Sequence, residues 1–219
     1  MGKIVKLLAK YYPVYLSGLW GTLWISAVTV LLGLVLGMLV ALMRMSRSKL
    51  LNAVSGVYIE VLRGTPILLQ LYFFWIGLPK LVPFELSDTQ CIVVALAVNA
   101  SAFISEIIRA GIAAVDKGQW EAERSIGLSE THVMTHVILP QAVKNILPAL
   151  CNEFISTVKG TSLASVFFVG ELMTSFKTVQ SATFLALQSL TIVGVIYFIL
   201  NFVLSRLLKI LERRLMVSD

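Results

Sequence analysis

Polar side chains interrupt stretches of this sequence that are otherwise apolar, and they are the first candidates for chemistry. Glu153 has no basic residue within one helical turn, since Lys159 lies six positions further on. Ionisable residues at membrane depth are energetically expensive and typically mark substrate or ion pathways. A carboxylate at this position would suit a ligand that carries an ammonium or guanidinium group.

Neighbouring polar residues could complete a pocket around Glu153. The stretch after Glu153 is polar, and an earlier apolar stretch carries an amide and hydroxyls at middle depth. Helix breaks near the bilayer midplane can coordinate a polar solute, but hydrogen bonds between two helices would explain the same residues. Both interpretations stay open. The candidate substrate-binding residues are Asn99, Ser101, Glu153, Thr157, Thr161 and Ser162.

Two pairs of opposite charge also fall within apolar stretches. Glu60 precedes Arg63, and Glu106 precedes Arg109, each by three residues. This spacing places both members of a pair on one helix face. We expect these pairs to act as clasps between helices, and a cytoplasmic gate that rearranges on opening is the alternative.

Composition defines the elements that must position these residues. The 219 residues are 58% hydrophobic and 14% charged, with a mean hydropathy of +0.87, whereas soluble domains are about 45–50% apolar. The sequence therefore predicts an all-α polytopic membrane protein without a separate soluble domain. The net charge of +6 is spread over short loops, which is typical of membrane topology and argues against a nucleic-acid partner.

The hydrophobic pattern predicts five membrane spans preceded by an amphipathic segment. Residues 1–17 place lysines opposite apolar residues and favour an interfacial helix, and residues 18–219 form the transmembrane domain. Breaks are expected at Arg63–Pro66 and at Lys159–Thr161, and a small loop at 171–177. The predicted spans cover residues 18–43, 54–79, 89–115, 143–168 and 183–208.

Basic residues favour one orientation of these spans. Cytoplasmic loops carry an excess of lysine and arginine. The first loop, the region from Arg109 to Lys144 and the C-terminal tail together hold eleven of the eighteen basic residues. This distribution predicts an N-terminus outside and a C-terminus in the cytoplasm, although the three N-terminal lysines oppose it.

Residues 117–140 form a polar island between two apolar spans. Good helix formers run up to Ile126, Gly127 can adopt the left-handed conformation that ends a helix, and Ser129 suits an N-cap. The sequence therefore predicts two short helices joined at a glycine, tethered to the membrane at both ends. Such a segment is suited to dock a soluble partner.

The island also carries a family motif. It resembles the EAA loop of ABC-importer permeases, whose pattern is E-A-A, three residues, G, nine residues, I-x-L-P. Glu123 replaces the second alanine and Val137 replaces the isoleucine. The resemblance implies that the loop contacts an ATPase subunit and transmits its motion. The residues that match the motif are Glu121, Ala122, Gly127, Leu139 and Pro140.

Nearly the whole chain is similar to permeases for polar amino acids, including the segments 60–66, 118–122 and 159–163. The resemblance implies the type I permease fold of ABC importers in the bacterial plasma (inner) membrane. It implies as partners two cytoplasmic ABC ATPase subunits, a second permease chain in a homo- or heterodimer, and an extracytoplasmic substrate-binding protein. The substrate would be a polar amino acid.

ATP hydrolysis requires another polypeptide, because the chain lacks the phosphate-binding pattern G-x-x-x-x-G-K-[ST]. ATP and magnesium are expected on the partner ATPase, and no cofactor in this chain. His132 and His136 lack the glutamate of a zinc-protease motif, so no metal site is predicted.

Three functions compete for these features. An ATP-driven permease working by alternating access explains the island. An ATP-independent channel or secondary transporter, using the intramembrane charges as an ion relay, leaves the island unexplained, and a membrane enzyme would need a catalytic cluster that the sequence does not contain. Glu153 favours arginine, lysine or histidine as substrate, although a carboxylate here could be architectural.

Overall fold

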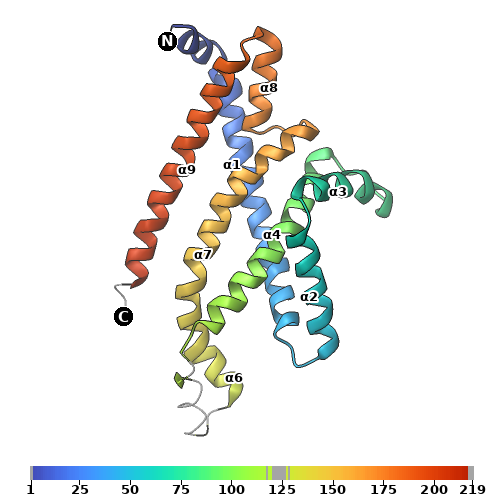
Figure 1. The fold of residues 1–219 in the computed structure, drawn as a ribbon, viewed down its shortest axis with the longest axis vertical. Helices are drawn as coiled ribbons and strands as arrows, with labels where there is room; N and C mark the ends of the chain where they lie inside the picture. Colours follow the sequence, from blue (N-terminus) through green and yellow to red (C-terminus); the bar gives the residue numbers. More distant parts are fainter. Residues whose placement is uncertain (1, 117, 120–126, 128, 217–219) are drawn as a thin grey trace.

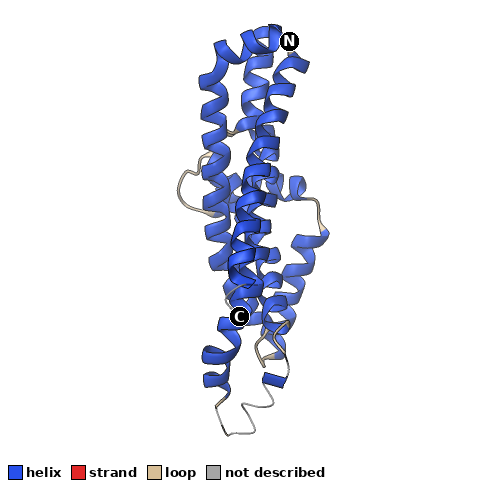
Figure 2. Cartoon of the chain, turned by 90° about the vertical axis from the view of Figure 1, so that its left-hand side faces the viewer, coloured by secondary structure: helices blue, strands red, loops and turns tan. Residues whose placement is uncertain are grey.

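The protein is an elongated bundle of helices (Figure 1). A computed structural model describes residues 2–116, 118–119, 127 and 129–216. Helices and connecting loops, without a β-strand, make up these described residues (Figure 2), which confirms the all-α prediction. A π-helical turn (Met134–Ile138) joins α6 to α7, and a 3-10 helix (Thr161–Phe167) follows α7. The α-helices are α1 (Gly2–Arg44), α2 (Lys49–Gly64), α3 (Ile67–Leu81), α4 (Asp88–Ala113), α6 (Glu130–Val133), α7 (Leu139–Gly160), α8 (Leu172–Thr183) and α9 (Ala186–Met216).

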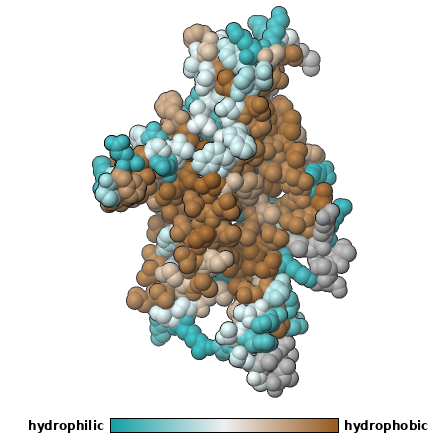
Figure 3. All heavy atoms as spheres, turned by 180° about the vertical axis from the view of Figure 1, so that it is seen from behind, coloured by the Kyte–Doolittle hydropathy of each residue, from teal (hydrophilic) through white to brown (hydrophobic). Residues whose placement is uncertain are grey.

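On the face seen in Figure 3, apolar side chains cover the middle of the bundle, and polar side chains gather at its two ends and on a projection at one side. Among the described residues, α1, α4 and α9 are long and apolar enough to cross a membrane, and the bent pair α2–α3 can count as a fourth span. Helix α7 covers most of the predicted span 143–168 but does not reach the same apolarity. The number of five spans therefore stays a prediction.

Helix α1 joins the predicted N-terminal segment to the first span without a loop. Its backbone leaves helical geometry only at Tyr11 (φ −113°, ψ 15°), two residues before Pro13. Proline lacks an N–H group and its ring clashes with the carbonyl four residues earlier, so it bends a helix. Leu7 is buried in a cluster with Leu172 and Val179. The interfacial role of residues 1–17 stays a prediction.

Both predicted helix breaks are present. Helix α2 ends at Gly64, and α3 departs from it at an angle of 110°. Pro66 restricts the residue before it to extended backbone, and Thr65 indeed has φ −114° and ψ 148°. The second break falls where α7 ends at Gly160 and tightens into the 3-10 helix.

The prediction of a loop at 171–177 is wrong, because Glu171 is the N-cap of α8 and the following residues form its first turns. Glu171 caps this helix: its carboxylate oxygens accept from the backbone N–H groups of Met173 (2.7 Å) and Thr174 (2.6 Å). Tyr197 of α9 donates to the same carboxylate at 3.0 Å. Glu171 is fully buried, so a residue that resembled a loop signal holds α8 against α9.

The chain around α8 packs closely against two glycines of α1. A Cβ added at Gly21 would overlap the carbonyl oxygen of Gly170, and one at Gly18 would overlap the hydroxyl of Ser175. Ser175 donates to the carbonyl oxygen of Val14 at 2.9 Å. Backbone contact of this kind is available only where a side chain is absent.

Gly21→Ala is expected to lower the free energy of unfolding by about 1–3 kcal/mol, because the added methyl group must displace backbone rather than a flexible side chain. The midpoint of thermal unfolding in detergent measures the effect. Gly194→Ala in α9 is the matched control, since a Cβ there meets no atom within 4 Å. Equal midpoints for the two variants would contradict the close packing.

Candidate functional site

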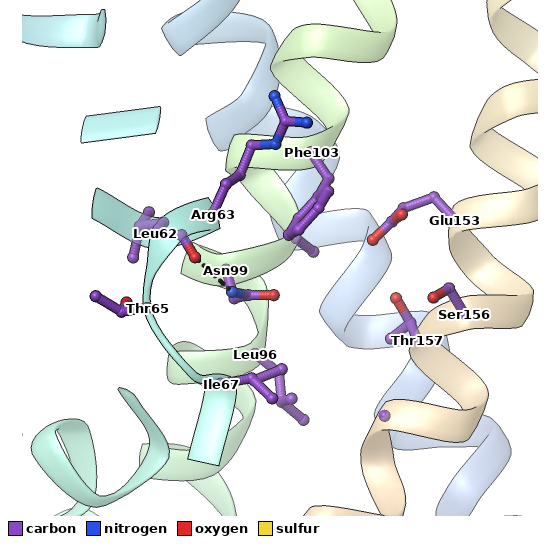
Figure 4. A pocket seen from close by; sticks show the side chains of 12 residues that line it. Leu62, Arg63, Thr65, Ile67, Leu96, Asn99, Phe103, Glu153, Ser156 and Thr157 are labelled. Atoms are coloured by element: carbon purple, nitrogen blue, oxygen red, sulfur yellow. Dashed lines mark hydrogen bonds between the residues drawn. The ribbon is translucent and has the colours of Figure 1, made fainter. Parts of the chain in front are cut away.

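A cavity of about 360 Å³ lies between the α2–α3 break, α4 and α7 (Figure 4). At the break, four residues line the cavity, and α4 and α7 form the facing walls; the four are Leu62, Arg63, Thr65 and Ile67. Apolar side chains such as Leu62 and Phe103 complete its lining. The polar residues that line it are Arg63, Thr65, Asn99, Glu153, Ser156 and Thr157.

Glu153 points from α7 into this cavity (Figure 4). The side chain is half-buried, and within the part of the chain that the structure describes no ion pair or hydrogen bond engages its carboxylate. A carboxylate has about four acceptor positions. These acceptor positions are therefore available to a ligand in the cavity.

Asn99 of α4 faces Glu153 across the cavity. Its Nδ2 donates to the Leu62 carbonyl oxygen at 3.3 Å and to Gln70 Oε1 at 2.9 Å. Its own carbonyl oxygen points toward α7 (Figure 4). The cavity is thus bordered by hydrogen-bond acceptors on both walls.

Only three of the six predicted substrate-binding residues line the cavity. Asn99, Glu153 and Thr157 line the cavity, and Ser101, Thr161 and Ser162 lie outside it. Ser101 is two residues from Asn99 and so faces another side of α4, where its Oγ lies 2.7 Å from the Tyr58 hydroxyl.

The two hydroxyls after α7 bond to their own turn of helix. Thr161 donates to the Val158 carbonyl oxygen at 2.9 Å, and Ser162 donates to that of Lys159 at 2.7 Å. Ser162 borders a separate groove against α9. The helix break carries both residues past the end of the cavity, so geometry does not support them as ligands.

The charged residues pair differently from the sequence expectation. Glu106 accepts from Arg109 Nε (3.0 Å) and Nη2 (2.8 Å), within one helix as expected. Arg63 Nη1 lies 3.8 Å from Glu106 Oε2, whereas Glu60 belongs to none of the ion pairs among the described residues. The pairing of Arg63 with Glu60 was therefore wrong: Glu60 is exposed, while Glu106 offers Arg63 a carboxylate across the α2–α4 interface.

Sequence reasoning missed several residues of the site. Arg63 was not among the candidate substrate-binding residues, yet it lines the cavity and its guanidinium lies 5.3 Å from the centre of the Phe103 ring. Gln70 was overlooked, although it is the one amide in the apolar stretch 67–78. It is 7% exposed and contacts Asn99. An isolated amide in an apolar stretch was the signal that could have found it.

Helix α6, in the described part of the predicted docking segment, lies at the end of the bundle opposite the N-terminus (Figure 1). Gly127 has φ +82°, the left-handed conformation expected from the sequence. Ser129 caps α6 by accepting from the His132 N–H group at 3.3 Å, which confirms the predicted N-cap. Glu130 pairs with Arg47 of the first loop, so both predicted cytoplasmic loops lie together.

The structure describes only some of the other motif residues. Glu121 and Ala122 lie outside the described residues. Leu139 and Pro140 are exposed and begin α7. Their role in contacting an ATPase stays a prediction.

A bundle of apolar helices long enough to cross a membrane, with a polar cavity at a helix break, has the architecture expected of a membrane transport protein. The chain belongs to the family of binding-protein-dependent transport system inner membrane components, whose model matches residues 33–217. It is therefore an ABC-importer permease, a transport subunit that crosses the inner membrane several times.

Known relatives are similar over nearly the full length. The arginine transport system permease protein ArtQ of Bacillus subtilis (strain 168) is 40% identical over 207 residues, covering 94% of each chain. The putative glutamine transport system permease protein GlnP of Rickettsia typhi is 34% identical over 218 residues, covering 98% of this chain and 100% of the relative.

Solved structures confirm the permease fold. A crystal structure of an amino acid ABC transporter with histidines matches with a TM-score of 0.91 and 43% identity, over 94% of this chain and 96% of that one. An inward-facing structure of the methionine transporter MetNI matches with a TM-score of 0.78 at 21% identity, over 92% and 96%. The second likeness concerns the fold alone.

Proposed function

We propose that this permease moves a basic amino acid (arginine, lysine or histidine) into the cell by ATP-driven alternating access. The observation that carries the proposal is the Glu153 carboxylate, which faces the cavity without a partner among the described residues. Guanidinium and ammonium groups are donors only. They complement a carboxylate on one wall and the Asn99 carbonyl oxygen on the other.

Arg63 adds a positive charge to the cavity that already contains the negative charge of Glu153. Arg63 lines the cavity, and its Nη1 lies 3.8 Å from the Glu106 carboxylate. The α-carboxylate of an amino acid can accept from this guanidinium while the side-chain cation meets Glu153. Two opposite charges at one cavity suit a ligand that carries both.

The relatives support an amino acid as substrate without selecting which one. The relative named for arginine is 40% identical, but one named for glutamine reaches 38% and one named for cystine 37%. Overall identity therefore discriminates weakly among these substrates. The choice of a basic amino acid rests on Glu153.

The driving force would come from partner subunits. Two cytoplasmic ATPases would bind ATP and magnesium, a second permease chain (identical or not) would pair with this one, and an extracytoplasmic binding protein would deliver the substrate. Glu121, Ala122, Gly127, Leu139 and Pro140 would contact the ATPases. The N-terminus lies at the end opposite this segment, which supports an N-terminus outside the cell.

Uptake by the complete transporter tests the function. The permease, its ATPase and its binding protein are reconstituted in liposomes, and uptake of labelled arginine and glutamine is followed with and without ATP. We expect ATP-dependent arginine uptake well above glutamine uptake. Preferred glutamine uptake would overturn the substrate, and uptake driven by an ion gradient without ATP would favour a secondary transporter.

A further inference from the structure

The α2–α3 break leaves one backbone acceptor beside the cavity without its helical partner. In an α-helix, the carbonyl oxygen of Leu62 would accept from the N–H group of residue 66. Residue 66 is proline, which has no N–H group. A buried carbonyl oxygen requires another hydrogen-bond donor. This requirement determines how the neighbouring amide side chains are oriented.

Two side-chain amides supply the donors. Gln70 Nε2 lies 2.8 Å from the Leu62 carbonyl oxygen, and it also donates to Thr65 Oγ1 at 2.8 Å and to the Thr65 carbonyl oxygen at 3.2 Å. Asn99 Nδ2 donates to the same Leu62 oxygen at 3.3 Å. Because backbone carbonyls only accept, both amides must present their NH₂ groups to the break.

The orientation of Gln70 then determines what it offers to Asn99. With Nε2 committed to the carbonyls, Gln70 presents Oε1, which accepts from Asn99 Nδ2 at 2.9 Å. The Asn99 carbonyl oxygen is therefore turned toward the cavity (Figure 4). Gln70 is 7% exposed and does not line the cavity.

We propose that Gln70 is a positioning residue that sets the polarity of the binding cavity, and thereby its preference for a cationic side chain. It acts through Asn99, whose NH₂ group it holds with a hydrogen bond of 2.9 Å; without Gln70, the longer bond of 3.3 Å to the Leu62 carbonyl oxygen would hold that group alone. An NH₂ group there would oppose a cation and favour a ligand with a carbonyl group. This inference rests on the proposed function and names a determinant of its specificity.

The test compares arginine with citrulline, in which a neutral ureido group replaces the guanidinium. Equilibrium binding of each labelled ligand is measured on the purified permease–ATPase complex without the binding protein, so that only the permease cavity selects. Gln70→Met keeps the side-chain length but can neither donate to Leu62 nor orient Asn99. We expect arginine affinity to fall roughly tenfold, the scale of one hydrogen bond to a charged group, while citrulline affinity is retained.

Gln70→Glu is the matched control. In its protonated form, the carboxyl group has one O–H group that can donate to the Leu62 carbonyl and a second oxygen that can accept from Asn99, so it can keep the two contacts on which the orientation of Asn99 depends. We expect it to keep the arginine-to-citrulline ratio of the unaltered protein. Loss of the ratio in Gln70→Glu would overturn the proposal even if Gln70→Met does not fold.

Other outcomes separate this inference from the proposed function. An equal fall for both ligands in Gln70→Met would show that Gln70 only stabilises the break, and no change for either would show that it does not act on the cavity. Both results overturn the inference. If the unaltered protein binds arginine no better than citrulline, or if Glu153→Gln leaves arginine binding unchanged, the proposed function itself fails.

Discussion

Glu153→Gln is expected to weaken arginine binding by roughly 10- to 100-fold, the range that corresponds to a hydrogen bond with a charged group. Glutamine nearly matches glutamate in size but offers an NH₂ group and no charge, so it removes the attraction for a guanidinium and keeps the packing. The cavity supplies no second carboxylate among its described lining residues. The effect should therefore fall on cationic ligands and spare neutral ones.

Binding of labelled arginine and citrulline to the permease–ATPase complex measures this effect. Glu85→Gln is the control, because Glu85 is exposed in the loop between α3 and α4 and lies outside the cavity. Arginine affinity should fall in Glu153→Gln alone, with citrulline affinity retained. An equal loss for both ligands would mean that Glu153 stabilises α7 rather than recognising charge.

Gly127→Val is expected to reduce ATP-dependent uptake about tenfold while basal ATP hydrolysis by the partner subunits persists. Gly127 holds φ +82°, and a side chain in left-handed backbone costs about 1–2 kcal/mol, more when it is β-branched. This cost shifts the segment away from its turn, and about 1.4 kcal/mol corresponds to a factor of ten. Under the proposed function, the docking segment at 117–140 would then pass less of the motion of the ATPases to the spans.

Uptake and hydrolysis are measured on the same liposomes, so that the number of transported molecules per ATP reports coupling. Gly118→Ala is the matched control in the same segment, since Gly118 has no positive φ and a Cβ there would meet only the flexible Asp116 side chain, at 3.1 Å. Unchanged transport per ATP in Gly127→Val would remove this turn from the coupling mechanism.

The sequence predicted features that depend on local chemistry. Pro66 forced the break after α2, and Gly160 marked the end of α7. Gly127 took the positive φ that it alone among residue types adopts without strain. Ser129 became an N-cap as expected. Each of these outcomes follows from the residue and its immediate neighbours.

Features that depend on contacts between distant segments could not be read in this way. Arg63 turned to Glu106 rather than Glu60, because the partner on α4 is visible only once α2 packs beside it. Ser101 was assigned to the pocket, but its register on α4 directs it to Tyr58. Glu171 looked like part of a loop, and its capping role depends on α9 as well as α8.

The cavity itself combines both kinds of information. Glu153 was recognisable as a carboxylate within an apolar stretch. Asn99 on α4 is oriented by two acceptors in the α2–α3 pair: Gln70 Oε1 and the Leu62 carbonyl oxygen, which has no helical donor because residue 66 is proline. Sequence reasoning therefore found the carboxylate that lines the cavity and missed Gln70, which contacts Asn99 on the facing wall.

Determining the structure of the permease–ATPase complex with arginine tests the central claim most directly. We predict density for arginine in the cavity between the α2–α3 break and α7. Its guanidinium should lie within hydrogen-bond distance of the Glu153 carboxylate and the Asn99 carbonyl oxygen. An empty cavity at saturating arginine, or an arginine whose guanidinium points away from Glu153, would contradict it.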